Sequence, residues 1–130
     1  MLRWVIWSVF AIAWTLALEL SVAEPPEEMP GREVIENYRK LLAKSAHAAV
    51  YVFFTVLSAW VPMRQRYRWL MMLFLMVHAW GTEMLQEVLF WHFGRTGSLL
   101  DVGFDVLGIL LGVALSWKWW MQDDVSEPEA

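Results

Sequence analysis

A chain of 130 residues is long enough for one domain, and 58% of its residues are hydrophobic, including ten Trp, seven Phe and eight Met. This composition is unusual for a soluble domain and typical of a membrane protein whose Trp rings lie at the lipid–water boundary. The net charge of −4 comes mostly from acidic residues in segments 24–36 and 123–129. The sequence has no basic patch suited to nucleic acid, and without Cys it excludes disulfides and thiolate metal sites.

Four apolar runs come close to the roughly 20 residues that a helix needs to cross the hydrocarbon core of a bilayer. They span residues 4–20, 46–61, 69–91 and 99–120. Backbone groups in lipid must be hydrogen-bonded within the segment, so we expect helices. The runs therefore predict an all-α membrane protein, a bundle of four transmembrane helices. Its expected interface anchors are Trp4, Trp60, Trp69, Trp91, Trp117, Trp119 and Trp120.

Residues 1–23 contain the first apolar run. The basic Arg3, an apolar middle and the sequence SVAEPP also resemble a secretory signal with a cleavage site after Ala23. We expect a retained transmembrane helix, with a cleaved signal as the alternative.

Residues 24–45 form a polar segment before the second run. The prolines and glycine of EPPEEMPG exclude a regular helix at its start. The sequence REVIENYRKLLAKSAH then places its apolar residues on one helical face, with Glu36 and Lys40 paired four apart on the other. We expect a short interfacial amphipathic helix that lies on the membrane surface. A solvated helical stalk is the alternative.

Residues 46–120 contain the remaining three spans, and residues 121–130 are expected to form an acidic disordered tail. Arg64, Arg66 and Arg68 crowd the very short loop between the second and third spans. The excess of basic residues in cytoplasmic loops places this loop inside the cell. Both termini are then expected in the cytoplasm.

Polar and ionisable side chains recur at helical spacing on three of the predicted spans. They are Lys44, His47 and Tyr51 on the second, Glu83 and Gln86 on the third, and Asp101 and Asp105 on the fourth. Spacings of three and four put each set on one helix face. A charge near the bilayer centre costs about 2.5–3.5 kcal/mol. We therefore expect these groups, with Arg95, to meet in one mutually neutralised cluster near the outer membrane surface.

Gly108 and Gly112 continue the face of the two aspartates. A Gly-x-x-x-Gly spacing lets a neighbouring helix approach closely, because neither residue carries a side chain. This predicts that the same face of the fourth span points into the bundle.

Simpler roles are open for several of these residues. Ser98 and Asp101 fit an N-terminal capping box. Arg95 could extend its side chain to lipid head groups, and Lys44 with His47 could serve only as an interfacial anchor.

Two further ionisable residues are expected outside the cluster. His78 lies five positions before Glu83, which is roughly 140° around the helix. We expect it to be neutral and bonded to another helix. Glu87 lies nearer the surface and is expected to be solvated.

Four motifs in order carry a resemblance to a family. KSAHAAVY, EMLQ, GRTGSLLD and DVGFDVLGILLG together resemble the VanZ-like membrane proteins, over more than half of the chain, from residue 44 to residue 112. The resemblance implies a small multi-pass protein of the bacterial cytoplasmic membrane, in a family whose founding member is linked with low-level teicoplanin resistance. It implies no settled mechanism. The chain departs from the family pattern at Asp105, where an Asn is usual.

We expect the cluster to bind a ligand of the cell envelope. Its cations, Lys44, His47 and Arg95, would meet an anionic head group, because Arg and Lys donate charge-assisted hydrogen bonds to phosphate. Glu83, Gln86 and Asp101 would hold these cations in position, and Tyr51 and Asp105 complete the set. The expected partners are membrane lipids, including a lipid-linked cell-wall precursor, or a lipoglycopeptide, and no cofactor is expected.

An intramembrane hydrolase is the alternative, with Glu83, His47 and Asp101 as candidate catalytic residues. A divalent cation could be held by carboxylates and His, namely His47, Glu83, Glu87, Asp101 and Asp105. The sequence has no HExxH, Gly-x-Ser-x-Gly or Cys nucleophile to support it. A scaffold subunit of a membrane complex is the third hypothesis.

Overall fold

The computed structural model of the chain describes residues 1–18, 30–88 and 99–122. These residues form α1 (Leu2–Leu18), α2 (Arg32–Trp60), α3 (Gln65–Val88), α5 (Leu99–Leu115) and α6 (Trp117–Trp120). They include no strand, so the all-α prediction is confirmed. The predicted cleavage site after Ala23, the irregular linker up to residue 29, the loop that carries Arg95 and the acidic tail from residue 123 lie outside the described residues.

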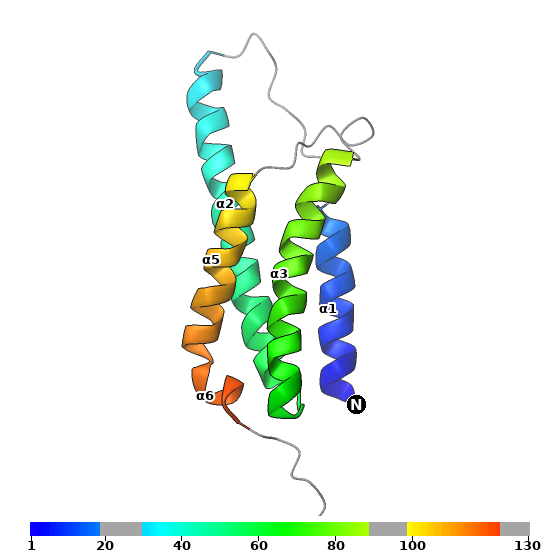
Figure 1. Ribbon diagram of the computed structural model, residues 1–130. Coiled ribbons are helices and arrows are strands. Elements are labelled where there is room, and N and C mark those ends of the chain that lie inside the picture. The colour runs from blue at the N-terminus through cyan, green and yellow to red at the C-terminus, as the bar shows by residue number, and fades with distance from the viewer. Residues whose placement is uncertain (19–29, 89–98, 123–130) are drawn as a thin grey trace, which may run out of the picture.

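The long helices pack side by side and alternate in direction, as in an up-down-up-down bundle (Figure 1). The N-terminus, the turn between α2 and α3, and α6 lie at one end of the bundle, which carries Arg3, Arg64 and Lys118 and is called the basic end. The start of α5 and the end of α3 lie at the other, which is called the polar end (Figure 1). A core that includes Phe54, Leu75 and Ile109 fills the space between the helices.

The helix α2 is continuous over 29 residues, and its first turns project beyond the neighbouring helices (Figure 1). The prediction of a separate interfacial helix before the second span is therefore wrong. Neither Gly nor Pro occurs from residue 32 to residue 60, so nothing interrupts the backbone hydrogen bonds where the amphipathic pattern meets the apolar one. Residues 32–43 form a helical stalk, the alternative interpretation.

The turn between α2 and α3 follows from a proline. Val61 is extended (φ −73°, ψ 130°), because the ring of Pro62 disfavours a helical conformation in the residue before it. The chain re-enters a helix at Gln65. So short a connection makes α2 and α3 antiparallel neighbours.

Two arginines close the end of α2, where backbone carbonyls lack helical partners. Arg68 is almost fully buried, and its Nε and one Nη donate to the carbonyl oxygens of Gln122 (2.9 Å) and Ala59 (3.0 Å). Arg3 donates to the carbonyl of Trp60 at 3.2 Å and lies over its ring. Arg68, counted from the sequence as one of three loop cations, is thus an internal link between α2, α3 and the segment after α6.

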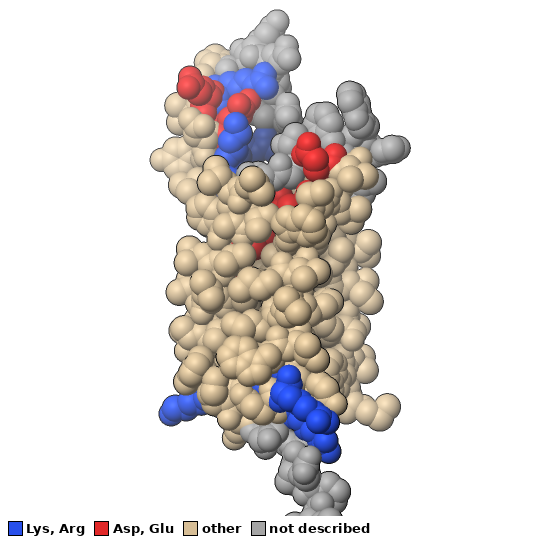
Figure 2. All heavy atoms as spheres, in the orientation of Figure 1, with Lys and Arg blue, Asp and Glu red and all other residues tan. Residues whose placement is uncertain are grey.

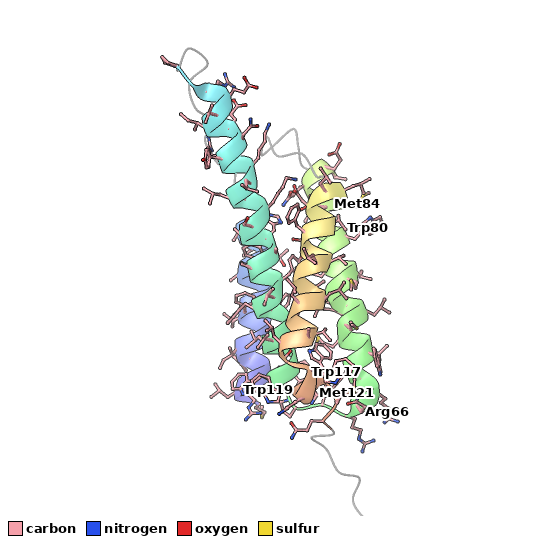
Figure 3. All side chains as sticks on the ribbon, turned by 90° about the vertical axis from the view of Figure 1, so that its left-hand side faces the viewer. Arg66, Trp80, Met84, Trp117, Trp119 and Met121 are labelled. Atoms are coloured by element: carbon pink, nitrogen blue, oxygen red, sulfur yellow. The ribbon has the colours of Figure 1, made fainter. Side chains whose placement is uncertain are left out.

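The fourth apolar run does not form one helix to its end. The helix α5 stops at Leu115, and the Ser116 hydroxyl donates to the carbonyl of Gly112 (2.5 Å) while it accepts from Nε1 of Trp120 (3.1 Å). Trp120 is consequently buried, and its prediction as an exposed interface anchor is wrong. Trp117 and Trp119 remain exposed near the basic end (Figure 3).

The two glycines of the Gly-x-x-x-Gly motif lie against α2. A Cβ built on Gly108 would lie 2.4 Å from the carbonyl oxygen of Ala48, and one on Gly112 would lie 2.5 Å from Cβ of Thr55. Real Cβ atoms do not approach other atoms so closely. The distance between α2 and α5 therefore depends on the absence of side chains at these two positions.

Large apolar side chains cover the outside of the bundle. They include Val5, Val9, Ile12 and Leu16 of α1, Leu70, Leu73, Val77 and Trp80 of α3, and Leu107, Leu110, Leu111 and Leu115 of α5. Charged side chains gather at the two ends, with a broad uncharged band between them (Figure 2). Among the helices of the described residues, α2 alone is both long enough and apolar enough, by length and composition, to cross a membrane.

The contact between α2 and α5 can be tested with a pair of glycine substitutions. We expect Gly108→Ala to destabilise the protein by about 1–3 kcal/mol, because the new methyl group forces the helices apart. Thermal denaturation of the detergent-purified protein measures the effect. Gly103→Ala is the control, since a Cβ at Gly103 meets no atom within 4 Å. Equal melting temperatures for the two variants would show that the close approach is not needed.

Candidate functional site

Three helices bring a histidine and two carboxylates together inside the bundle. His47 of α2, Glu83 of α3 and Asp105 of α5 form a group that we call the His47 cluster. Nδ1 of His47 lies 3.3 Å from Oδ1 of Asp105 and 3.8 Å from Oε1 of Glu83. His47 and Glu83 are nearly inaccessible and Asp105 is completely so.

The geometry of the cluster follows from the contact between α2 and α5. Gly108 lies against Ala48, the residue directly after His47, and Asp105 precedes Gly108 by one helical turn. Side chains three apart share a helix face, so the contact that holds Gly108 to α2 also turns Asp105 towards His47. Glu83 joins them from the last turns of α3.

A more open ion pair lies one turn closer to the polar end. Nζ of Lys44 contacts Oδ1 of Asp101 at 2.5 Å, and about a quarter of each side chain is exposed. Lys44 is three residues before His47 and Asp101 is four before Asp105, so the pair lies next to the buried cluster. The ammonium group of Lys44 also lies 5.7 Å from the centre of the Phe104 ring. We call Lys44 and Asp101 the mouth pair.

A chain of hydrogen bonds lies one turn on the other side of the cluster, towards the basic end. Nε2 of His78 is 2.9 Å from the Thr15 hydroxyl, and Nδ1 of His78 is 2.9 Å from the Tyr51 hydroxyl. Thr15 donates its own proton to the carbonyl of Ala11 (2.8 Å), so its oxygen accepts from Nε2–H of His78. A neutral His78 then accepts the Tyr51 proton at Nδ1, and α1, α2 and α3 are linked through one ring.

The other predicted site residues divide into three groups. Gln86 is buried one turn after Glu83, on the same face of α3. Glu87 is exposed. Arg95 and Ser98 lie outside the described residues, as does any capping of α5 by Ser98.

The candidate catalytic set of Glu83, His47 and Asp101 is not the set that the structure brings together. Asp101 is paired with Lys44, and Asp105 takes its place beside His47 and Glu83. From the sequence, both aspartates share one helix face, and only the depth of the contact between α2 and α5 separates their roles.

Trp14 and Thr15 of α1 are contributors that the sequence did not identify. The Trp14 ring meets the His47 ring edge-on, with 5.9 Å between centroids, and Thr15 binds His78. Both residues lie in the first apolar run, in which Ser8 and Glu19 are also polar. Ser8, Thr15 and Glu19 are seven and four residues apart and share a helix face, and this spacing was the available signal.

The His47 cluster holds two carboxyl groups beside one imidazole in the interior of the bundle. Removing a charge from water costs several kcal/mol unless it is paired and hydrogen-bonded. In the described part of the chain, however, neither oxygen of Asp105 nor Nδ1 of His47 makes a hydrogen bond. The arrangement suits a positively charged ligand more than an anion.

No family model, curated protein or solved structure matches the chain.

The Tyr51 and His78 contact supports a stability prediction. We expect Tyr51→Phe to lower stability by about 1 kcal/mol, because Nδ1 of His78 loses its donor inside the bundle. Thermal denaturation in detergent measures it. Tyr67→Phe is the control, since Tyr67 is exposed and its hydroxyl only accepts from Arg66 at 3.1 Å. Equal losses in both variants would contradict a special role for Tyr51.

Proposed function

We propose that the chain is a multi-pass integral membrane protein whose four long helices all cross the bilayer. The support is the band of apolar side chains on the outer faces of α1, α3 and α5, bounded by charged groups at both ends (Figure 2). A helix of 17 residues, the length of α1 and α5, spans about 25 Å, close to the hydrocarbon thickness of about 30 Å. The VanZ-like motifs favour the same architecture and a bacterial cytoplasmic membrane.

The proposed orientation has the basic end in the cytoplasm and the polar end outside. Its support is the density of cations in a short loop, Arg64 and Arg66, together with Arg3 and Lys118 at the same end. The acidic residues of the stalk do not oppose this orientation, because acidic residues contribute little to the preference of basic loops for the cytoplasmic side.

Single-cysteine variants test the spans and their orientation, since the chain has no Cys of its own. A membrane-impermeant maleimide should label Tyr38→Cys, on the stalk, in intact cells. It should label Arg66→Cys only after the membrane is permeabilised, and Leu73→Cys, on the apolar face of α3, in neither case. The reverse pattern for the first two variants would overturn the orientation. Labelling of all three in intact cells would overturn the membrane-spanning bundle.

We further propose that the site binds the anionic head group of an envelope lipid at the mouth pair. The carrying observation is the partly open contact between Lys44 and Asp101, at the end of a bundle whose sides are otherwise apolar. A lipid with its chains along the bundle would bring its phosphate to this level. Lys44 has three N–H donors, and one carboxylate leaves some of them for a phosphate oxygen.

The role of His47 in this proposal differs from the expected one. His47 was a candidate cation for the head group, but the two carboxylates beside it leave no net positive charge there. Lys44 is therefore the described residue on which the proposed binding depends, with Arg95 as the second expected cation.

Lipid retention tests this function. Native mass spectrometry of the detergent-purified protein, incubated with phosphatidylglycerol, a polyprenyl phosphate or phosphatidylcholine, gives the bound fraction of each. We expect Lys44→Gln to weaken binding of the two anionic lipids about tenfold or more, since a charge-assisted hydrogen bond contributes about 1.5–3 kcal/mol. Phosphatidylcholine should show no such difference.

The matched control is Lys40→Gln, which removes the same charge one turn away on the exposed stalk. Equal binding by the two variants would show that the mouth pair does not hold the head group. A preference for the polyprenyl phosphate over phosphatidylglycerol would identify a cell-wall carrier lipid as the source of the phosphate.

A further inference from the structure

The His47 cluster has the donor set of a metal site. It combines one imidazole nitrogen with two carboxylate groups, a set that suits zinc and manganese. Each ligand comes from a different helix, so the cluster is preformed by the packing of α2, α3 and α5. Candidate ligand atoms of the three residues all lie within 4.8 Å of one another.

The distances are close to those of a coordinated cation. Ligand atoms about 2.1 Å from a tetrahedral zinc lie about 3.4 Å from one another. Nδ1 of His47 is 3.3 Å from Asp105 and 3.8 Å from Glu83, so two edges of such a site are nearly in place. Small rotations of the carboxylate groups would complete the third edge.

Asp105 provides an independent observation. Its side chain is completely buried, and neither of its oxygens makes a hydrogen bond with the described residues, although it points at Nδ1 of His47. His47 is an ion-pair partner at 3.3 Å, and an ionised carboxylate needs further partners to offset complete burial. A cation at the centre of the cluster would supply them.

Charge balance favours the same ligand. A divalent cation, two ionised carboxylates and a neutral imidazole sum to zero. Neutral clusters avoid the large cost of a net charge in a medium of low dielectric constant.

We propose that His47, Glu83 and Asp105 bind one divalent transition-metal cation, zinc or manganese. Three protein ligands leave at least one coordination position for water or another ligand. The proposal does not depend on lipid binding, because it rests on residues buried beneath the mouth pair.

Metal analysis of the purified protein tests the proposal. The protein is loaded with zinc or manganese, desalted and measured by plasma mass spectrometry. We expect about one ion per wild-type chain and an affinity reduced about tenfold or more in Asp105→Asn, which keeps the side-chain shape but removes the charge. Asp101→Asn, one turn away on the same face, is the matched control and should retain the ion.

Thermal denaturation gives a second readout. A chelator should lower the melting temperature of wild type and of Asp101→Asn, because an ion bound only to the folded state stabilises it. Asp105→Asn should not respond, although it should fold, since the substitution removes a buried charge. Wild type that takes up neither metal, or Asp105→Asn that binds as well as wild type, would overturn the proposal.

The metal and lipid proposals fail separately. Lys44→Gln should lose lipid and keep metal. A wild type without metal, in which Lys44→Gln still differs from Lys40→Gln in lipid retention, would remove the metal site alone. Metal bound in the absence of that lipid difference would remove the lipid site alone.

Discussion

The close approach of α2 and α5 is the constraint on which the rest of the structure depends. Gly108 and Gly112 let the backbone of α5 pack against Ala48 and Thr55. This contact fixes which residues of α2 and α5 lie opposite each other. Asp105 lies beside His47, and one turn nearer the polar end Asp101 lies beside Lys44. The two glycines thus determine which charged groups of α2 and α5 are paired, although they contribute no polar side chain themselves. A wider helix pair would expose these groups or separate them.

The ionisable groups inside the bundle are arranged in more separate sets than the sequence suggested. A single neutralised cluster was expected, but the structure divides the ionisable groups by depth. The mouth pair joins opposite charges and is partly open, whereas the His47 cluster is buried and holds two carboxyl groups. His78 lies deeper still, in a chain of hydrogen bonds. Buried ion pairs add little stability on their own. The proposed metal ion would give this buried cluster a role other than stability.

Periodicity was a good guide to the helices and to the faces of their polar residues. The apolar runs placed helices within a few residues of α1 and α3, and spacings of three and four identified the faces that carry Lys44, Glu83 and Asp105. The pattern could not show that α2 continues through the change from amphipathic to apolar sequence, because continuity depends on the absence of a breaker. It also could not show that α5 ends at Leu115, because the residues that follow, Ser116 to Trp120, include no Gly or Pro to mark the end of a helix.

How deeply a side chain is buried, and which group it pairs with, depend on tertiary packing, so the sequence could not predict them. Asp101 and Asp105 are equivalent in a helical projection, yet only Asp105 is fully enclosed. Arg68 is one of three arginines in a dense basic loop, and only packing reveals that it binds the carbonyls of Ala59 and Gln122. The proposed membrane-spanning role of α1, α3 and α5 rests on their apolar outer faces.

The unbroken course of α2 couples two ends of the molecule mechanically. Its outer third stands clear of the other helices (Figure 1), and the same rigid rod carries Lys44, His47 and Tyr51 into the bundle before Arg3 and Arg68 fasten its far end. A rod fixed at its base acts as a lever. A sideways displacement of the exposed stalk would move Lys44 of the mouth pair most, and would move His47 and Tyr51 progressively less.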